Sequence, residues 1–229
     1  MQPYIFPYIG YFQLINVVDK FVIYNDVNFI RQGWINRNRV LSGGKELLYT
    51  VPLENASSFK KINEVAIHQK LYNTWKIKFF RTLHASYSRA PFFTPTLSLV
   101  KDTLDKELVT IDLLATESIK NTCNYLGITT PIVLSSEPGT GKELRGKDRV
   151  ISICHKESAS TYINVVGGQD LYSKDHFREN GLALSFIQPK PIIYPQFSNE
   201  FVPWLSVIDI MMFNSPGDIQ QMLTEYTLI

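Results

Sequence analysis

The sequence predicts an α/β protein that has a mostly parallel central sheet with flanking helices, an antiparallel hairpin insertion and a helical subdomain. The sheet is predicted by short apolar runs that alternate with helical patterns, since strands buried on both faces are apolar throughout. The hairpin is predicted by Gly43-Gly44 between two extended runs, and the subdomain by helical periodicity across residues 71–126.

The first 70 residues are expected to contain the first helix, the first core strand and the insertion. Gly43 and Gly44 can supply the positive φ angles that a tight hairpin turn needs, because glycine has no Cβ to clash. The expected elements are a helix at 11–19, a strand at 20–25, hairpin strands at 34–40 and 46–53, and a third short strand at 63–68.

The rest of the chain alternates helical and apolar extended patterns. The expected helices are at 71–87, 95–108, 111–126, 148–158, 175–180, 205–214 and 216–226. The expected strands are at 131–134, 161–165 and 182–187, with a polar loop at 135–147 and a proline-rich segment at 189–203. Gly127 is a candidate C-cap for the helix before it. We therefore expect an α/β core formed by 1–70 and 127–229, and a helical subdomain at 71–126.

The composition is that of an ordinary soluble protein and excludes several function classes. With 23 basic and 21 acidic residues, the net charge of +2 argues against electrostatic capture of nucleic acid or of a membrane surface. No apolar run approaches the roughly 18 residues of a membrane span, and Pro3 and Pro7 interrupt any signal-peptide pattern. Two cysteines are too few for a disulfide framework, and the four histidines lack metal-ligand spacing. We expect a cytoplasmic location, no membrane insertion and no metal site.

Two clusters near the amino terminus indicate a small-molecule site. Residues 2–12 contain two prolines and five aromatic residues, and residues 28–39 contain three arginines, three asparagines and a tryptophan. Guanidinium groups match phosphate or carboxylate, and flat aromatic side chains stack on rings. On a strand, Arg37 and Arg39 would share one face and Asn36 and Asn38 the other. A polar, anionic ligand that contains a ring is the expected occupant, and solvated surface arginines are the alternative.

Candidates also follow the predicted strands, because open parallel sheets bind ligands beyond the carboxyl ends of their strands. Asp26 is a candidate catalytic residue that would contact a hydroxyl or an amine, and a turn-capping role is the alternative. His155 is the second candidate for taking a proton, while the adjacent Cys154 is expected to be a buried structural thiol. Asp209 interrupts an apolar helical run, so we expect it to be buried with an arginine from 31–39.

The residues 8–11, Tyr-Ile-Gly-Tyr, occupy a turn into a helix where HIGH-type nucleotidyltransferases and related ligases place His-x-Gly-His. Tyrosine cannot supply the imidazolium charge of those enzymes, and a turn shaped by proline and glycine, with tyrosines packed over it, is the favoured explanation of the segment. The complete set of expected substrate-binding residues is Gln2, Tyr8, Tyr11, Arg31, Trp34, Asn36, Arg37, Asn38, Ser135, Ser136, Arg149, Gly167, Gly168 and Gln196.

Several of these segments together resemble the WbqC-like protein family over essentially the whole chain. The resemblance is carried by MQPYIFPYIGYFQLI at 1–15, YNDVNFIRQGWINRNRV at 24–40, IVLSSE at 132–137, RVISIC at 149–154, YINVVGGQDLY at 162–172, YPQF at 194–197 and LSVIDIMMFN at 205–214. Relatives usually carry several residues before the Gln-Pro pair, so we expect a shortened first strand or a natural start further upstream. The resemblance implies a role in O-antigen or other surface-polysaccharide biosynthesis, often beside sugar aminotransferases.

Residues and resemblance together lead to one main hypothesis and two alternatives. The main hypothesis is a transferase that acylates or aminoacylates, for example glycylates, the amine of a nucleotide-linked amino sugar. One alternative is a non-catalytic sugar-nucleotide-binding or scaffold protein that partners a sugar aminotransferase. The other is an ATP-dependent adenylate-forming ligase, which alone of the three would need ATP and Mg²⁺ as cofactors. No Asp-x-Asp motif supports a metal-dependent glycosyltransferase.

Overall fold

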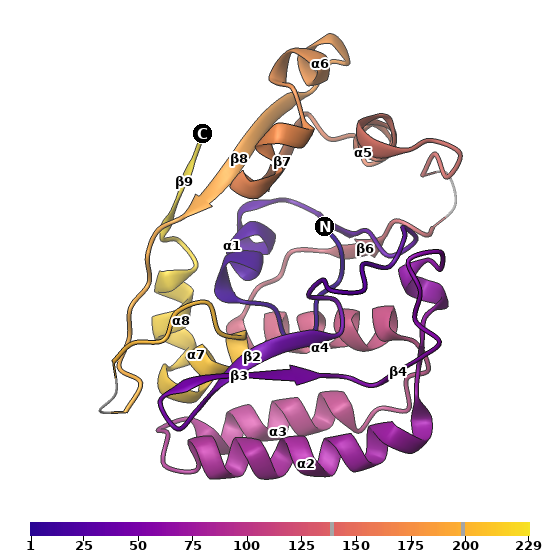
Figure 1. Ribbon diagram of the computed structural model, residues 1–229. Coiled ribbons are helices and arrows are strands. Elements are labelled where there is room, and N and C mark those ends of the chain that lie inside the picture. Colours follow the sequence, from indigo (N-terminus) through magenta and orange to yellow (C-terminus); the bar gives the residue numbers. More distant parts are fainter. Residues whose placement is uncertain (138–139, 198–199) are drawn as a thin grey trace.

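The computed structural model describes residues 1–137, 140–197 and 200–229. Residues 138–139 of the expected polar loop and 198–199 of the expected proline-rich segment lie outside the described residues. The chain forms a larger body of helices and short sheets, with a smaller part above it in Figure 1. The upper part contains α5 (Gly146–Lys156), α6 (Lys174–Glu179) and the strands β7 (Thr161–Val165), β8 (Ala183–Pro189) and β9 (Tyr226–Leu228).

The strands of the described residues form several small sheets. In the body, β1 (Phe21–Ile23) pairs in parallel with β6 (Ile132–Leu134), with Phe21 opposite Ile132. In the upper part, β7 pairs in parallel with β8, and β9 joins β8 in the antiparallel sense. The α/β class is therefore confirmed, whereas one mostly parallel central sheet is not.

The core strands do not join because other segments occupy their edges. The first residues of the chain run beside β1: the N–H of Met1 donates to the Val22 carbonyl (2.8 Å), and the Tyr24 N–H donates to the Met1 carbonyl (2.7 Å). Helix α1 (Ile9–Val17) packs instead against β7 and β8. The four expected core strands thus exist as two parallel pairs, which Figure 1 shows in the body and in the upper part.

The expected antiparallel hairpin is present. Strand β2 (Arg37–Ser42) pairs with β3 (Lys45–Thr50) through a turn in which Gly43 and Gly44 have φ angles of 58° and 75°. The expected third strand is β5 (Ala66–Ile67), after the 3-10 turn η1 (Ile62–Glu64), but β5 pairs with β4 (Leu53–Glu54) and not with the hairpin.

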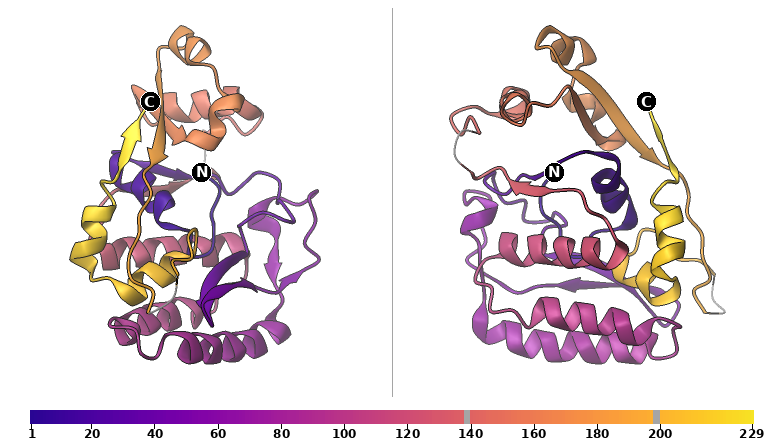
Figure 2. Two further views of the ribbon diagram at one scale, coloured as in Figure 1. Left: turned by 60° about the vertical axis from the view of Figure 1, so that its left-hand side comes forward. Right: turned by 180° about the vertical axis from the view of Figure 1, so that it is seen from behind.

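Three helices form one side of the body: two lie below the hairpin, and the third lies behind it in Figure 1 and in front of it in the right-hand view of Figure 2. They are α2 (Gln69–Tyr87), α3 (Phe93–Leu104) and α4 (Ile111–Leu126), and Gly127 caps α4 with a φ angle of 70°. The last helices are α7 (Val207–Phe213) and α8 (Pro216–Met222). Helix α8 ends earlier than expected because the chain there turns into β9, whose edge pairing with β8 the sequence did not indicate.

The buried apolar side chains form two clusters. The larger one joins the amino-terminal segment, the hairpin and helices α2 to α4, through residues such as Phe6, Val40 and Leu83. The smaller one lies in the upper part and includes Ile151, Cys154 and Phe177. The division into a core and a helical subdomain at 71–126 stays a prediction, and these helices share the body's core. Within the described residues, no helix combines the length and apolarity needed to cross a membrane.

Candidate functional site

The carboxyl ends of β1 and β6 bring together three of the expected residues. Asp26 follows β1, Ser135 follows β6, and Arg149 reaches both from α5. Arg149 Nη2 donates to one carboxylate oxygen of Asp26, and Ser135 Oγ donates to the other (2.6 Å). Arg149 Nη2 also contacts the Ser135 carbonyl (3.3 Å). A carboxylate, a hydroxyl and a guanidinium thus meet where parallel strands end, which is the usual place for a ligand.

The charges of this cluster are almost fully enclosed. Asp26 is 5% exposed and Arg149 is 4% exposed. Burial alone would raise the pKa of Asp26, but hydrogen bonds from Ser135 and Arg149, together with the Arg149 charge, hold that pKa below its ordinary value. Asp26 is therefore a carboxylate at neutral pH.

Arg149 has a buried N–H donor without a partner among the described residues. Its guanidinium carbon lies 5.0 Å from the centre of the Tyr24 ring, so the ring face stabilises the charge. Within the part of the chain that the structure describes, the buried Nε atom of Arg149 has no hydrogen-bond partner. A buried N–H donor usually finds a partner, so this donor is available to an anionic or carbonyl oxygen.

A second layer of side chains fixes Asp26 and Ser135. Asn25 Nδ2 donates to Asp112 of α4 (3.0 Å), and Asn25 Oδ1 accepts from the backbone N–H of Ser136 (3.2 Å). The backbone N–H of Asn25 donates to Ser135 Oγ (3.2 Å). Asn25 therefore ties β1, β6 and α4 together directly behind the cluster. Sequence reasoning missed Asn25 and Tyr24, although both adjoin Asp26 at a strand end.

The arginines of the second sequence cluster lie on the surface around one tryptophan. The guanidinium carbons of Arg37 and Arg39 lie 5.5 and 4.9 Å from the centre of the Trp34 ring. Arg37 donates to the carbonyls of Gln32 and Gly33, while Arg39 pairs with Glu46 at 2.8 Å. Arg31 is exposed. Arg37 thus lies beside Trp34, as does Arg39, and cation–π contacts with the Trp34 ring hold the two guanidinium groups in place.

Asn36 and Asn38 lie on the opposite, buried face of this segment, as the strand alternation predicts. Asn36 Nδ2 donates to the Val51 carbonyl (2.9 Å), and Asn38 Nδ2 donates to the Phe6 carbonyl (2.8 Å). Both amides are occupied in holding the hairpin and the amino-terminal segment. These contacts show that both side chains stabilise the local fold.

The amino-terminal segment is held in a strained conformation beside the arginines. Phe6 has a φ angle of 40°, which costs a residue other than glycine roughly 1–3 kcal/mol. Its carbonyl accepts hydrogen bonds from Asn38 and from Ser206 Oγ (2.7 Å), and its N–H donates to Ser118 Oγ (3.0 Å). Three side chains distant in sequence thus fix the backbone immediately before Tyr8.

The two tyrosines of the Tyr-Ile-Gly-Tyr segment differ in accessibility. Tyr11 is buried, its hydroxyl donates to the Gln2 carbonyl (2.8 Å), and burial raises its pKa well above the ordinary value. Tyr8 is half-buried, and its ring meets that of Trp204 edge to face, with centroids 6.1 Å apart. A Cβ added to Gly10 would lie 2.4 Å from the Tyr8 ring, so glycine is needed for this ring position.

The remaining expected residues make their contacts elsewhere in the structure and not with the Asp26 cluster. His155 is exposed, and its Nε2 lies 2.9 Å from the Asn180 carbonyl. Gly167 and Gly168 belong to the 3-10 turn η2 (Val166–Leu171), where Gly168 packs on the Asn164 side chain. Cys154 is buried as expected, and burial raises the pKa of its thiol to about 11.

Gln196 belongs to a buried polar cluster around Asp209. Asp209 accepts hydrogen bonds from the hydroxyls of Tyr87 and Tyr194 and from Gln196 Nε2, each at 2.7 Å. The expected arginine partner is therefore wrong, because neutral donors from α2 and from residues 194–196 surround the carboxyl group. Burial raises the pKa of Asp209, and the three hydrogen bonds offset this only in part.

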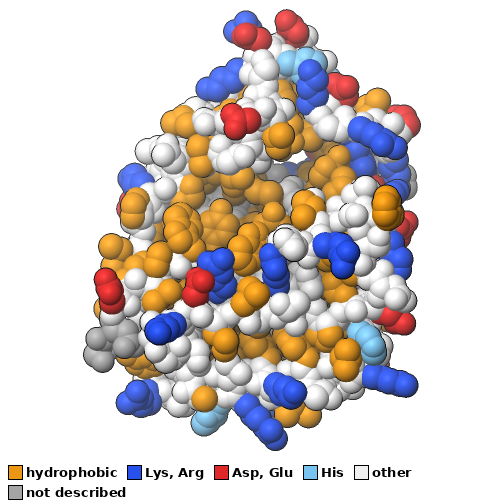
Figure 3. Space-filling model, viewed as in Figure 1, with side chains coloured by type: hydrophobic (Ala, Val, Ile, Leu, Met, Phe, Trp, Pro, Cys, Tyr) orange, Lys and Arg blue, Asp and Glu red, His pale blue; other side chains and the backbone are white. Residues whose placement is uncertain are grey.

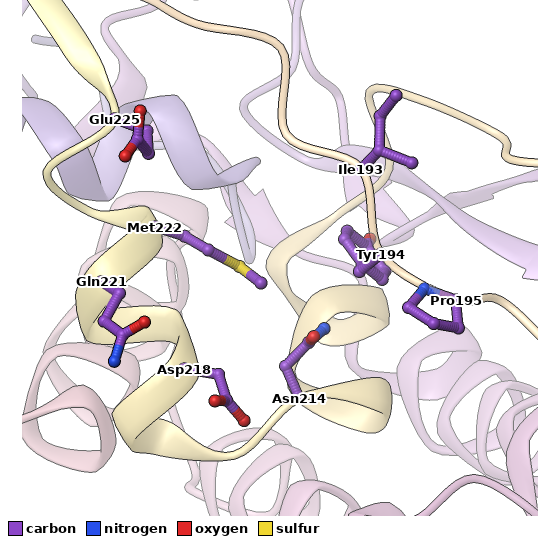
Figure 4. A pocket seen from close by; sticks show the side chains of 8 residues that line it. All are labelled: Ile193, Tyr194, Pro195, Asn214, Asp218, Gln221, Met222 and Glu225. Atoms are coloured by element: carbon purple, nitrogen blue, oxygen red, sulfur yellow. The ribbon is translucent and has the colours of Figure 1, made fainter.

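An open cavity of about 390 Å³ lies between residues 193–195 and α8 (Figure 4). Its lining residues are Ile193, Tyr194, Pro195, Asn214, Asp218, Gln221, Met222 and Glu225. None of the expected site residues lines it, and two of its acidic groups are engaged, Asp218 with Ser215 and Glu225 with Lys190. We place the candidate site at the Asp26 cluster and the Trp34 face instead.

Figure 3 shows how the face of Figure 1 is shaped. Hydrophobic side chains line a hollow between the body and the upper part, and a row of Lys and Arg side chains crosses the face just below it. Such a surface combines apolar area for a ring with positive charge for an anion.

Comparison with known proteins places the chain in a family. The sequence matches the WbqC-like protein family over residues 2–221, so the chain belongs to that family. It is also similar to the "Uncharacterized protein Rv1507c" of Mycobacterium tuberculosis, with 28% identity over 210 residues that cover 90% of this chain and 88% of that protein. No solved structure matches the sequence significantly.

Proposed function

We propose that this protein is a transferase of surface-polysaccharide sugar biosynthesis that acylates or aminoacylates the amine of a nucleotide-linked amino sugar. The observation that carries the proposal is the meeting of Asp26, Ser135 and Arg149 at the ends of two parallel strands. Family membership supports the polysaccharide setting, which the resemblance of the motifs implies.

Each side chain of the site has a specific role in the proposed reaction. The Arg37 and Arg39 guanidiniums, fixed on Trp34, hold the diphosphate, and aromatic rings beside them carry the nucleotide base. Asp26, a carboxylate at neutral pH, orients the sugar amine and stabilises the positive charge that grows on nitrogen as it attacks. The free Nε–H of Arg149 donates to the carbonyl oxygen of the acyl group.

The reaction replaces one bond at the acyl carbon and removes one proton from the amine nitrogen. The amine nitrogen bonds to the acyl carbon, the bond between that carbon and the leaving group of an activated donor breaks, and the nitrogen loses one proton to water. The lowered pKa of Asp26 makes it a better positioning group than a proton acceptor.

One experiment with two parallel incubations separates this proposal from its two alternatives. The protein is mixed with a dTDP-linked amino sugar and an aminoacyl thioester or, in parallel, with glycine, ATP and Mg²⁺, and the products are analysed by mass spectrometry. A new amide from the thioester supports the transferase, and a new amide with AMP supports the ligase. Binding of the nucleotide sugar with no amide in either arm contradicts both and supports a scaffold.

A further inference from the structure

Trp204 is the most exposed tryptophan of the chain, and no role for it followed from the sequence. It is 71% exposed and has a φ angle of 60°, which a bulky residue adopts only where surrounding structure enforces it. The two other tryptophans are covered: Trp34 by arginines, and Trp75 by stacking on Tyr72 and Phe79. A large apolar ring held outward at a conformational cost points to a binding partner for its face.

The backbone around Trp204 is fastened to the arginine face and to the amino-terminal segment. The N–H of Ser206 donates to the Arg39 carbonyl (2.8 Å), and the N–H of Val207 donates to the Pro7 carbonyl (2.9 Å). Ser206 Oγ donates to the strained Phe6 carbonyl. Trp204 and Tyr8 therefore adjoin two backbone segments that are hydrogen-bonded to each other, and their rings meet edge to face.

Val202, two residues before Trp204, is fixed as well. Gln196 accepts from the Val202 N–H (2.7 Å), donates to the Val202 carbonyl (3.1 Å), and donates to buried Asp209. Asp209 thus positions Val202, acting through Gln196. A rigid support lowers the entropy cost of binding, because the aromatic ring is already in place.

We propose that Trp204, supported at its edge by Tyr8, stacks on the base of the nucleotide whose diphosphate the Arg37 and Arg39 face binds. This inference rests on the proposed function and adds to it the residue that carries the base and the direction in which the nucleotide lies. The base is next to Trp204, and the phosphates extend from there toward Trp34. Two phosphates bring charge that complements the two guanidiniums, and an aromatic base fits the exposed indole face.

The test compares dTDP with inorganic pyrophosphate on the full chain by calorimetry and by tryptophan fluorescence. For Trp204→Leu we expect dTDP affinity to fall about tenfold or more, as loss of a base–aromatic stack does, with pyrophosphate affinity unchanged. Trp204→Phe keeps most dTDP affinity but loses most of the fluorescence quenching by dTDP. Trp75→Phe, which removes a tryptophan already stacked on Tyr72 and Phe79, keeps the dTDP affinity and the fluorescence quenching. Arg37→Ala weakens the binding of both dTDP and pyrophosphate.

The outcomes separate this inference from the proposal beneath it. If wild-type protein binds dTDP and Arg37→Ala weakens it, but Trp204→Leu binds dTDP as tightly as wild type, the stacking role of Trp204 is overturned while the proposed function stands. If wild-type protein binds neither dTDP nor pyrophosphate, the nucleotide site of the proposed function is itself overturned. Unfolding of Trp204→Leu in urea checks that the exposed side chain can be removed without loss of the fold.

Discussion

Arg149 on α5 donates to the carboxylate of Asp26, 123 positions earlier in the chain, and the pair joins the upper part of the molecule to the body. Removing one member leaves the other charge buried and unpaired. We therefore expect Asp26→Asn and Arg149→Met each to lower the free energy of unfolding by about 3–5 kcal/mol.

The double variant is expected to be less destabilised than the sum of the two single variants, because no lone charge remains. Urea unfolding of the four proteins measures this coupling. The exposed pair Asp175–Arg178 is the control, and its removal should cost at most about 1 kcal/mol. Additive effects at Asp26 and Arg149 would show that the two side chains do not form the buried pair.

Two of the buried aspartates, Asp26 and Asp209, predict opposite responses to pH. The pKa of Asp26 is lowered in the folded state, so its contribution to stability is present above the ordinary pKa of 3.8 and is lost as pH falls below it. The pKa of Asp209 is raised, so the folded state binds the proton more tightly and this contribution is lost as pH rises from 3.8 through the folded pKa. Urea unfolding from acidic to neutral pH measures both slopes.

Single variants assign the two slopes. Asp26→Asn should flatten the fall in stability at low pH, and Asp209→Asn should remove the fall that accompanies rising pH. The same sign of change for both variants would contradict the environments described for these carboxyl groups.

Tyr87 bridges the hairpin and Asp209, so removing its hydroxyl should be costly. The hydroxyl donates to Asp209 and accepts from the Leu41 N–H (2.6 Å), and both groups are buried. Tyr87→Phe leaves two polar groups without this partner, and we expect each loss to lower the free energy of unfolding by roughly 1–3 kcal/mol. Tyr72→Phe, which loses a single hydrogen bond to the Leu104 carbonyl (3.0 Å), should cost less in thermal or urea unfolding. Equal costs would argue against the double role of Tyr87.

Gly10 tests whether the position of the Tyr8 ring matters for binding. A Cβ at Gly10 would lie 2.4 Å from that ring and 3.2 Å from Pro189, so Gly10→Ala must displace Tyr8. We expect Gly10→Ala to weaken dTDP binding about tenfold if one stacking contact is lost.

Gly217→Ala is the matched control, since its nearest neighbour would be Ser215 Oγ at 3.8 Å and the substitution lies in α8. It should leave dTDP affinity unchanged and is expected to be neutral or stabilising by about 0.4–1 kcal/mol. Binding by Gly10→Ala equal to that of this control would remove Tyr8 from the site.

Local signals in the sequence predicted the elements well, and long-range pairing less so. The hairpin at Gly43-Gly44 and the C-cap at Gly127 are matched closely, because turns and caps depend on neighbouring residues. The single sheet was not predicted correctly. The sequence of a short apolar strand does not indicate which other strand it pairs with. Here the first residues of the chain occupy one edge of β1.

The candidate site was predictable to a similar degree. The strand-end rule pointed to Asp26 and Ser135, and Arg149 was expected separately as a substrate-binding residue; the structure brings the three together. The donors around Asp209 were not predictable, because neutral hydroxyl and amide groups can satisfy a buried carboxyl group as an arginine does. Trp204 was missed because only its exposure and backbone conformation single it out.

The central claim is that the face around Trp34, with the Asp26 cluster, binds a nucleotide-linked sugar. Calorimetric titration of a dTDP-linked amino sugar into wild type, Arg37→Ala and the exposed α2 control Arg81→Ala tests it most directly. The account predicts saturable binding to wild type and Arg81→Ala, and binding at least about tenfold weaker to Arg37→Ala, as expected for a lost charge-assisted contact. Equal affinity of all three proteins, or no binding to wild type, would contradict it.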